Sequence, residues 1–451
     1  MRKAQIYYLI TEEREAATLP TSSIQRTSAI ASITSIWHEA LLPYLGTRLV
    51  LILVGLLADF YILPLLKSNP LLSPVDLNTH FPDALWLMWK HFDAGFYVDI
   101  AEHGYWAAST LHTTSNWIFL PLYPMLIYPF GHLFGGSDSA FDVAGIVVSN
   151  IAGLVAVTYL YLLVRREFGS RIASRTVFYL ALFPTSFYLS AIYPESVFLA
   201  GTIACIYYAR QRRWWLAGIC GAVASLARIQ GFLLIVPVAW EYWQVLSDRY
   251  FPLPDMSSMT LLEKVHTWLY SRLRWPSLAA LELRNWSNLV AVAFIPLGLV
   301  PFLIYSKIKT GDLLATIHNH HVGWGRYVEP PWQLLVYALS HPQSPNPLNW
   351  NFWLLNIIVI FVFLGFTAWS LRRLPMIYAL YALVLVLMPL STASINSLSR
   401  YYLVIFPALI LLALWGNHDE QPTRHFLIMS LFATLQAVFM IFFVLGLPLI
   451  A

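Results

Sequence analysis

The stretch VAGIVVSNIAGLVAVTYLYLLV, residues 143–164, decides the fold class because it is apolar, uncharged and long enough to cross a lipid bilayer as one helix. A bilayer-spanning helix needs about 20 apolar residues. Equally uncharged runs occupy residues 288–306, 351–371 and 425–451. One such run fits a buried helix in a soluble protein, but four together predict a polytopic membrane protein.

The overall composition supports an all-α membrane protein. Of the 451 residues, 58% are hydrophobic and 11% charged, whereas soluble domains carry roughly 25% charged residues. The mean hydropathy is +0.63. The net charge of +4 is too small to indicate a nucleic-acid partner. Cys205 and Cys220 lie in apolar stretches, which favours free, packed thiols over a disulfide.

The distribution of apolar runs predicts a polar N-terminal tail, residues 1–40, and one transmembrane domain, residues 41–451. No cleavable signal peptide is evident in the tail. About eleven spans are expected, several of them short, as in helices that tilt or break. They lie near residues 42–66, 143–164, 176–193, 195–209, 214–227, 229–246, 288–306, 352–371, 374–390, 401–416 and 425–448.

Arginine and lysine residues in the connections predict the orientation, since basic loops stay in the cytoplasm. The N-terminal tail and the loop 247–287 belong to the basic, cytoplasmic set. Large extracytoplasmic loops then cover residues 67–141, with helices of their own, and 307–351. This alternation requires that residues 118–134, interrupted by three prolines, form an interfacial or re-entrant hairpin and not a span. We expect an integral plasma-membrane protein with an outward-facing site.

The first outer loop contains a cluster of acidic and histidine residues among aromatics. Asp93 and Glu102 are nine residues apart, which is about 900° of helix and places them on opposite faces, so paired-carboxylate catalysis by these two is not supported. Asp99 and His103 are spaced to pair as i and i+4. By itself, Asp93 is most simply interpreted as the N-cap of a helix.

Three further ionisable residues lie at the outer ends of predicted spans. Glu195 and Arg228 interrupt apolar stretches, where charges are costly and usually functional. A mutual ion pair with a purely structural role explains them equally well. For Arg400, the simple interpretation is an interfacial side chain that extends toward the headgroups.

The loop 307–351 contains His318, His320 and His321, followed by Arg326. A metal site is not favoured, because no carboxylate lies at a standard ligand spacing and adjacent histidines point apart. We expect polar lining of an outer cavity. The chain has no phosphate-binding loop, dinucleotide fingerprint or nucleophile elbow, so the donor substrate of an enzyme would arrive in the membrane.

The outward motifs, taken in order, resemble a known family of membrane enzymes. They are HFDAGFY (91–97), IAEHGY (100–105), FLPLYP (119–124), FPTSF (183–187), YPES (193–196), RIQG (228–231), WGR (324–326), PPW (330–332) and SRY (399–401). This ordered set is similar to that of prokaryotic mannosyltransferases related to the second mannosyltransferase of GPI-anchor synthesis, which are C-type (GT-C) glycosyltransferases. Phe92 and Gln230 depart from the usual Trp and Asn, which leaves the acceptor undefined.

The resemblance implies transfer of a sugar, mannose in the family, from a polyprenyl-phosphate donor to a hydroxyl acceptor, with inversion. The acceptor is a glycolipid, a glycan or a protein hydroxyl. Asp93 becomes the candidate general base. The implied donor-phosphate ligands are Arg400, Arg228 and Arg326, with Arg400 favoured. The implied sugar- or acceptor-binding residues are Glu102, His103, Glu195, Gln230, His318 and His320. No cofactor is required by the motifs, and dependence on a divalent cation is left open.

Three alternatives share the same spans. A polytopic transporter or flippase explains the buried charges, although transporter sites lie near the midplane and not at one face. A lipid-diphosphate-dependent ligase or polymerase of the O-antigen type would need a larger outer loop. A non-catalytic assembly subunit would tolerate the loss of Asp93.

Overall fold

The computed structural model describes residues 33–67, 81–106, 115–250, 263, 267, 282–342, 347–392, 394–417 and 422–447. Every regular element with stated bounds in these ranges is a helix, as the apolar runs predict. In chain order they are η2 (Trp37–Leu41), α3 (Leu42–Leu57), η3 (Ala58–Ile62), α4 (Leu63–Lys67), α5 (Ala84–Leu87), α6 (Ala94–His103), η4 (Asn116–Ile118), α7 (Leu122–Leu133), α8 (Asp138–Phe168), α9 (Ser170–Leu182), η5 (Ser186–Leu189), α10 (Glu195–Arg210), α11 (Trp214–Ala227), η6 (Ile229–Leu234), α12 (Ile235–Tyr250), α14 (Leu283–Leu297), α15 (Val300–Thr310), α16 (Ala315–Trp324), α17 (Pro331–Ser340), α18 (Pro347–Arg373), α19 (Met376–Leu390), α20 (Leu398–Tyr401), η8 (Tyr402–Val404), α21 (Phe406–Gly416) and α22 (Thr423–Val444).

The long apolar helices confirm the fold class, but not the expected span count. Within the described ranges, six helical stretches are long and apolar enough to cross a bilayer, and a bent pair, Leu398–Val404 with Phe406–Gly416, makes a seventh if it crosses as one span. The bend in that pair is 71°. The six stretches are Ile33–Leu65, Asp138–Phe168, Ile229–Tyr250, Asn285–Thr310, Trp353–Arg373 and Thr423–Val444.

The prediction of a single span over residues 176–193 is wrong. Helix α9 ends at Leu182, and Phe183 adopts an extended conformation, with φ −53° and ψ 138°. Pro184 explains this break, because a proline disfavours the helical conformation of the residue before it. The 13 residues of α9 extend about 20 Å, less than the roughly 30 Å of a hydrocarbon core.

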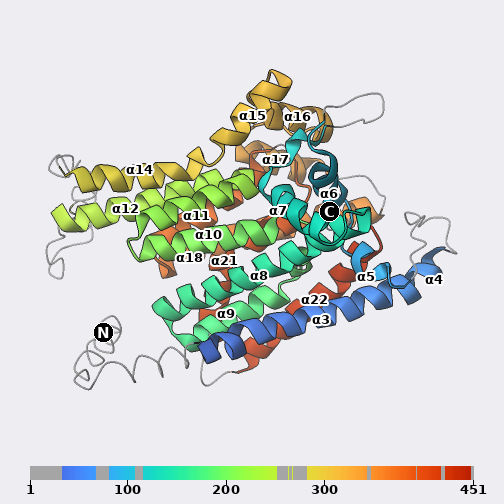
Figure 1. The fold of residues 1–451 in the computed structure, drawn as a ribbon. Coiled ribbons are helices and arrows are strands. Elements are labelled where there is room, and N and C mark those ends of the chain that lie inside the picture. The colour runs from blue at the N-terminus through green and yellow to red at the C-terminus, as the bar shows by residue number, and fades with distance from the viewer. Residues whose placement is uncertain are drawn as a thin grey trace.

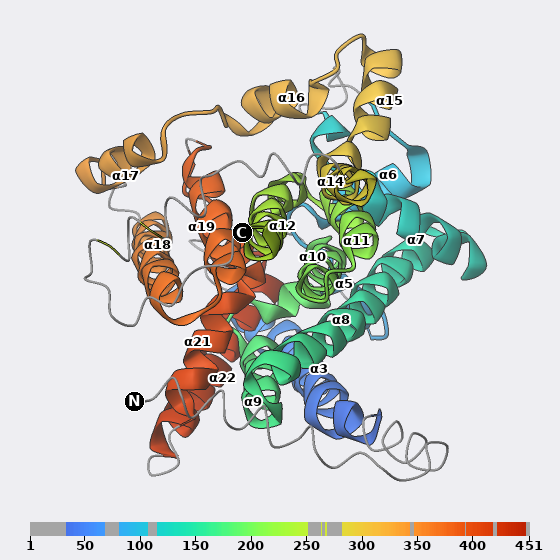
Figure 2. The same cartoon turned by 90° about the vertical axis from the view of Figure 1, so that its left-hand side faces the viewer.

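The helices form a bundle with a cluster of short helices at one end. Figure 1 shows α3, α8, α10, α12, α14 and α22 running side by side, while α6, α7, α15, α16 and α17 gather at one end, called the cap end below. Figure 2, turned by 90°, shows α15, α16 and α17 along one side of that end. Helix α7, with 12 residues, is about 18 Å long, too short to cross as one span. The tail 1–32 and most of the loop 247–287 lie outside the described residues.

Helix α10 forms the centre of the bundle and packs against both α8 and α11. It is buried on nearly all sides, as expected of a helix without a polar face. Small residues allow the close approach: a Cβ on Gly201 would lie 3.1 Å from the backbone N of Ala224. In the next interface, a Cβ on Gly218 would lie 2.0 Å from the Ala291 carbonyl oxygen. This packing fixes Glu195, the first residue of α10, at the cap end.

Candidate active site

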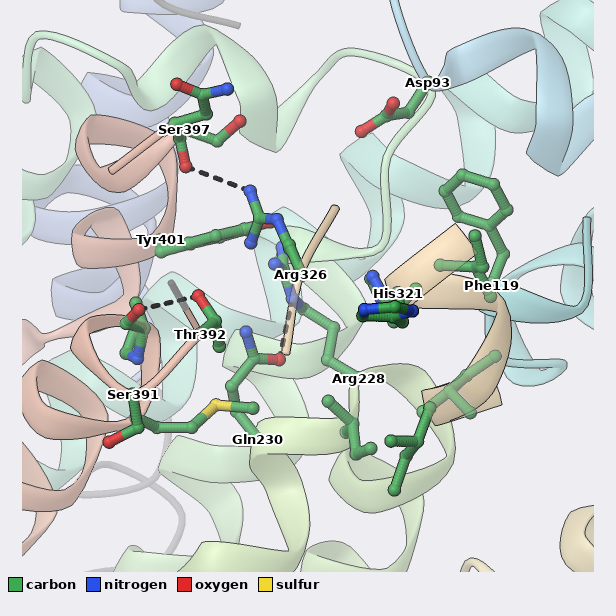
Figure 3. A pocket seen from close by; sticks show the side chains of 18 of the residues that line it. Asp93, Phe119, Arg228, Gln230, His321, Arg326, Ser391, Thr392, Ser397 and Tyr401 are labelled. Carbon is green, nitrogen blue, oxygen red and sulfur yellow. Dashed lines mark hydrogen bonds between the residues drawn. The ribbon is translucent and has the colours of Figure 1, made fainter. Parts of the chain in front are cut away.

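A large cavity lies at the cap end, bounded by α16, η6, α19, α20 and the residues around the start of α6. Its volume is about 1320 Å³. Its lining includes both apolar side chains and charged or polar groups. The lining residues that matter below are Asp93, Phe119, Arg228, Ile229, Gln230, Phe232, His318, His320, His321, Arg326, Asn396, Arg400 and Tyr401. Figure 3 shows the Asp93 carboxylate and the Arg326 guanidinium group directed into the same space.

Asp93 directs its carboxylate into the cavity instead of capping a helix. It occupies the position before α6, but its side chain makes no capping hydrogen bond. Oδ2 instead accepts a hydrogen bond from Nη1 of Arg400 at 3.0 Å. Asp93 thus holds the N-cap position, as the simple interpretation expects, but its side chain does not form the capping hydrogen bond. With 23% of its side chain exposed, the carboxylate remains accessible from the cavity.

The backbone that presents Asp93 is strained and held by a tyrosine. Phe92 has a φ of 53°, in the left-handed region that non-glycine residues rarely occupy. The hydroxyl of Tyr193 accepts a hydrogen bond from the Asp93 N–H at 3.0 Å and donates one to the His91 carbonyl at 2.8 Å. These two bonds fix the turn from both sides. Such strain persists only where the surroundings enforce it, which is common at functional sites.

Arg400 lies beneath Asp93 on α20, in the bent helix pair. Only 5% of the residue is exposed, so it is not the interfacial side chain of the simple interpretation. Its Nε lies 3.6 Å from Oε1 of Glu195, in addition to the contact with Asp93. Its guanidinium carbon lies 5.1 Å from the ring centroid of Tyr193. Arg400 thus connects Asp93 to the centre of the bundle.

Glu195 and Arg228 form the ion pair that their sequence positions suggested. Nη1 of Arg228 contacts Oε1 of Glu195. Nε of Arg228 donates to Oε1 of Gln230 at 3.2 Å, so both residues face the cavity together. Glu195 itself is fully buried below the two arginines and is not among the lining residues. Glu195 is therefore not placed to contact a sugar in this cavity, because the packing of α8 and α11 around α10 closes access to it.

Tyr401, which was not expected to be a site residue, brings three arginines together. The guanidinium carbons of Arg228, Arg400 and Arg326 lie 5.0, 5.2 and 5.4 Å from its ring centroid. Each distance is within the range of a cation–π contact. Arg326 donates to the carbonyl of Asn396 at 3.1 Å, and within the described ranges it forms no ion pair with a carboxylate. The SRY motif at 399–401 was the sequence signal for Tyr401.

His318 and His320, both on α16, add polar groups to the lining of the cavity. Nδ1 of His318 lies 2.7 Å from Oδ2 of Asp312, and this hydrogen bond lowers the pKa of the Asp312 carboxyl. Burial, together with the charge of Arg326, lowers the pKa of His320 to about 4. His320 is therefore neutral near pH 7. Within the described part of the chain, no group of three or more His, Cys, Asp or Glu residues is placed to hold a metal ion.

Glu102 and His103 lie on α6 away from the cavity lining. His103 pairs with Asp99 at 3.2 Å, which confirms the predicted i, i+4 contact. Burial, followed by the charge of Asp138, raises the pKa of Glu102. Neither residue lines this cavity, and a role of Glu102 and His103 in binding sugar or acceptor stays a prediction.

Comparison with known proteins gives one family match. Residues 120–252 match the sequence profile of the dolichyl-phosphate-mannose-protein mannosyltransferase family. No curated protein sequence matches the chain significantly. These residues contain Glu195, Arg228 and Gln230, whereas Asp93, Arg326 and Arg400 lie outside them.

Two groups of solved structures are similar to the chain. ArnT from Cupriavidus metallidurans bound to undecaprenyl phosphate is 15% identical, with a TM-score of 0.46 and coverage of 86% of this chain and 64% of that chain. The apo oligosaccharyltransferase of Archaeoglobus fulgidus is 15% identical, with a TM-score of 0.40 and coverage of 90% and 55%. The chain therefore spans less than two thirds of the length of either protein. The family match confirms the resemblance of this chain to membrane mannosyltransferases over residues 120–252.

Proposed function

We propose that the chain is an inverting glycosyltransferase that moves a sugar, mannose by family resemblance, from a polyprenyl-phosphate donor to a hydroxyl acceptor. The observation that carries the proposal is an accessible carboxylate, Asp93, that faces a cavity with an apolar wall and a group of three arginines. A lipid-linked sugar phosphate has the same division into apolar chain, anionic phosphate and polar sugar.

The charges of the site match a donor with one phosphate. Among the described residues, Arg228, Arg326 and Arg400 form ion pairs with two carboxylates, Asp93 and Glu195. One positive charge is left over, and a sugar phosphodiester carries one negative charge. Arg326 has no carboxylate partner in the part of the chain that the structure describes, which makes it the best phosphate ligand of the three. Arg326 therefore replaces Arg400 as the favoured phosphate ligand, because the guanidinium group of Arg400 is occupied by Asp93 and Glu195.

The reaction follows from this placement. The acceptor hydroxyl oxygen forms a bond to the anomeric carbon while the bond from that carbon to the phosphate oxygen breaks. The hydroxyl proton passes to Asp93, which acts as general base. The electron pair of the broken bond remains on the polyprenyl phosphate, where Arg326 and Arg228 stabilise the additional negative charge. Attack opposite to the leaving phosphate inverts the anomeric configuration.

The remaining lining residues fit the non-reacting parts of the substrates. Phe119, Ile229 and Phe232 offer an apolar wall for the first prenyl units. Gln230 and His318 offer polar groups for sugar hydroxyls. The acceptor, whether a glycolipid, a glycan or a protein hydroxyl, enters from the side of Asp93.

A donor and acceptor panel with the purified, reconstituted chain tests the proposal. We expect the labelled sugar of a polyprenyl-phosphate donor to appear in a new glycosidic bond, with mannose preferred among sugars. If the labelled donor instead crosses the vesicle bilayer without forming a product, the chain is a transporter or flippase. If donors with a lipid diphosphate are used as well or better, the single-phosphate assignment is wrong.

The proposed orientation places the cap end outside the cell. Exposed Ser139 lies near the start of α8, and exposed Ser170 lies at the start of α9 near the other end of the bundle. A membrane-impermeant thiol reagent added to intact cells should label Ser139→Cys and leave Ser170→Cys unlabelled. The reverse pattern contradicts the orientation.

A further inference from the structure

We propose that Glu195 is a specificity-determining residue that sets the charge of the cavity so that it prefers a lipid donor with one phosphate over a donor with two. This inference rests on the proposed function and concerns the same site. Glu195 does not touch the substrate; it acts through the two arginines that it holds.

The placement of Glu195 supports a role in charge balance. Its side chain is fully buried, and its Oε1 contacts Nη1 of Arg228 and lies 3.6 Å from Nε of Arg400. Its Oε2 has no hydrogen-bond partner among the residues that the structure describes. Burying a carboxylate oxygen without a hydrogen bond lowers the stability of the folded protein. Since a neutral glutamine could occupy a similar volume, the negative charge itself is the property that needs explanation.

The charge of Glu195 changes the net charge of the cavity by one unit. With Glu195 and Asp93 ionised, the three arginines leave one positive charge, which is neutralised by a sugar phosphodiester. Without the charge of Glu195, two positive charges remain, which match the two negative charges of a sugar linked through a diphosphate. Charges separated by only a few ångströms in a partly buried site interact strongly, so one unit changes the relative affinity of the two donors by about 10- to 100-fold.

Three variants test this inference. Glu195→Gln removes the charge at similar volume, Glu195→Asp keeps the charge on a shorter side chain, and Arg326→Gln removes one positive charge at a position that is only half-buried. Each reconstituted protein is titrated with two probes, the same sugar on polyprenyl phosphate and on polyprenyl diphosphate. The ligand-induced rise in unfolding temperature reports affinity without requiring turnover.

We expect the affinity ratio of diphosphate to monophosphate donor to rise by about 10-fold or more in Glu195→Gln. The ratio should stay near the wild-type value in Glu195→Asp and fall in Arg326→Gln. An unchanged ratio in folded Glu195→Gln, or a shift of the same size in Glu195→Asp, overturns the inference. If Glu195→Gln does not fold, Arg326→Gln provides the test, and an unchanged or higher affinity ratio in that variant overturns the inference. Failure of the wild type to bind either donor contradicts the proposed function instead.

Discussion

Helix α10 carries a cluster of arginine and glutamate at each of its ends, and the two clusters differ in which charge is in excess. At its last residue, Arg210 contacts Glu167 and Glu241, each at 2.6 Å, so two carboxylates enclose one guanidinium group. At its first residue, Glu195 contacts two arginines and a third lies nearby. Within the described ranges, every cation of the far cluster has a carboxylate partner, while the cap-end cluster has one cation, Arg326, that faces a cavity and has none.

The difference shows how the same residue types serve structure at one end and substrate binding at the other. Arg210 and its partners join α8, α10 and α12, and none of them lines the cavity. At the cap end, excess positive charge and an accessible carboxylate coincide with an opening large enough for a lipid-linked sugar. The cap-end cluster should therefore control transfer, and the far cluster should control stability alone.

The largest expected effect is that of Asp93→Asn. Loss of a general base typically lowers a rate by about 10²- to 10⁴-fold, and the amide keeps the volume of the side chain. The initial rate of glycosidic-bond formation, measured with saturating donor, checks this. Asp138→Asn, at an exposed position on α8 outside the cavity lining, is the matched control and should transfer normally. Rates in Asp93→Asn within a few-fold of wild type would remove Asp93 from the mechanism.

Arg326→Gln tests whether the cation without a carboxylate partner at the cap end binds the donor. A hydrogen bond to a charged group contributes about 1.5–3 kcal/mol, so the KM for the donor should rise by roughly 10- to 100-fold, with the unfolding temperature almost unchanged. Lys309→Gln removes an exposed cation on α15 outside the lining and serves as control. Equal effects of both variants on KM would mean that only the overall charge of the cap end matters.

Arg210→Gln tests the far cluster. The variant leaves the buried carboxylate of Glu241 and the half-buried carboxylate of Glu167 without their cation. We expect a loss of about 1–3 kcal/mol of stability, moderated because Arg210 is partly exposed. The unfolding temperature should fall, while transfer per folded molecule stays within about twofold of wild type, since the contact energies of distant sites are nearly independent. A large loss of specific activity in the folded protein would mean that the far cluster also controls transfer, contrary to the proposed division between the two clusters.

Tyr193→Phe probes the support of the turn at Asp93. The substitution removes the two hydrogen bonds that fix His91 and Asp93. A typical net hydrogen bond contributes about 1 kcal/mol, so kcat should fall by about 5- to 10-fold with little change in the KM for the donor. Tyr128→Phe, on an exposed face of α7, is the control. If KM rises and kcat is unchanged, Tyr193 acts on donor binding and not on the base.

The smallest expected effect on transfer is that of His320, which instead gives the stability a pH dependence. Burial and the charge of Arg326 lower its pKa to about 4, whereas a histidine in an unfolded chain titrates near 6.5. The unfolded chain therefore binds more protons between these values, and stability falls as the pH drops through this interval. His320→Gln should show a shallower fall in unfolding temperature between pH 6.5 and 4 than the wild type. Parallel curves would contradict this assignment.

Much of the fold could be predicted from the sequence because bilayer spans depend on local composition. The helices Asp138–Phe168 and Thr423–Val444 contain two of the apolar runs almost completely. The count of spans was harder to predict. Pro184 marks the break after α9, but the carbonyls that the break leaves exposed are bound by Arg48, a contact that is distant in the sequence. Arg48 donates to the carbonyls of Ala181 and Ser186 at 2.7 and 2.6 Å, from a helix distant in the sequence.

The candidate site could be predicted in part. The motifs identified Asp93, Arg228 and Arg326 as residues with chemistry, and the structure places all three on one cavity. The contact between Arg400 and Asp93 could not be foreseen, because 307 residues separate them. The burial of Glu195 likewise depends on long-range packing around α10, which a motif does not encode.

The most direct test of the central claim is a structure of Asp93→Asn bound to a polyprenyl-phosphate sugar. We expect the phosphate to lie against Arg326 and Arg228, and the prenyl chain to lie along the wall formed by Ile229 and Phe232. The anomeric carbon should face residue 93. A donor bound outside this cavity, or with its phosphate distant from all three arginines, would contradict the account.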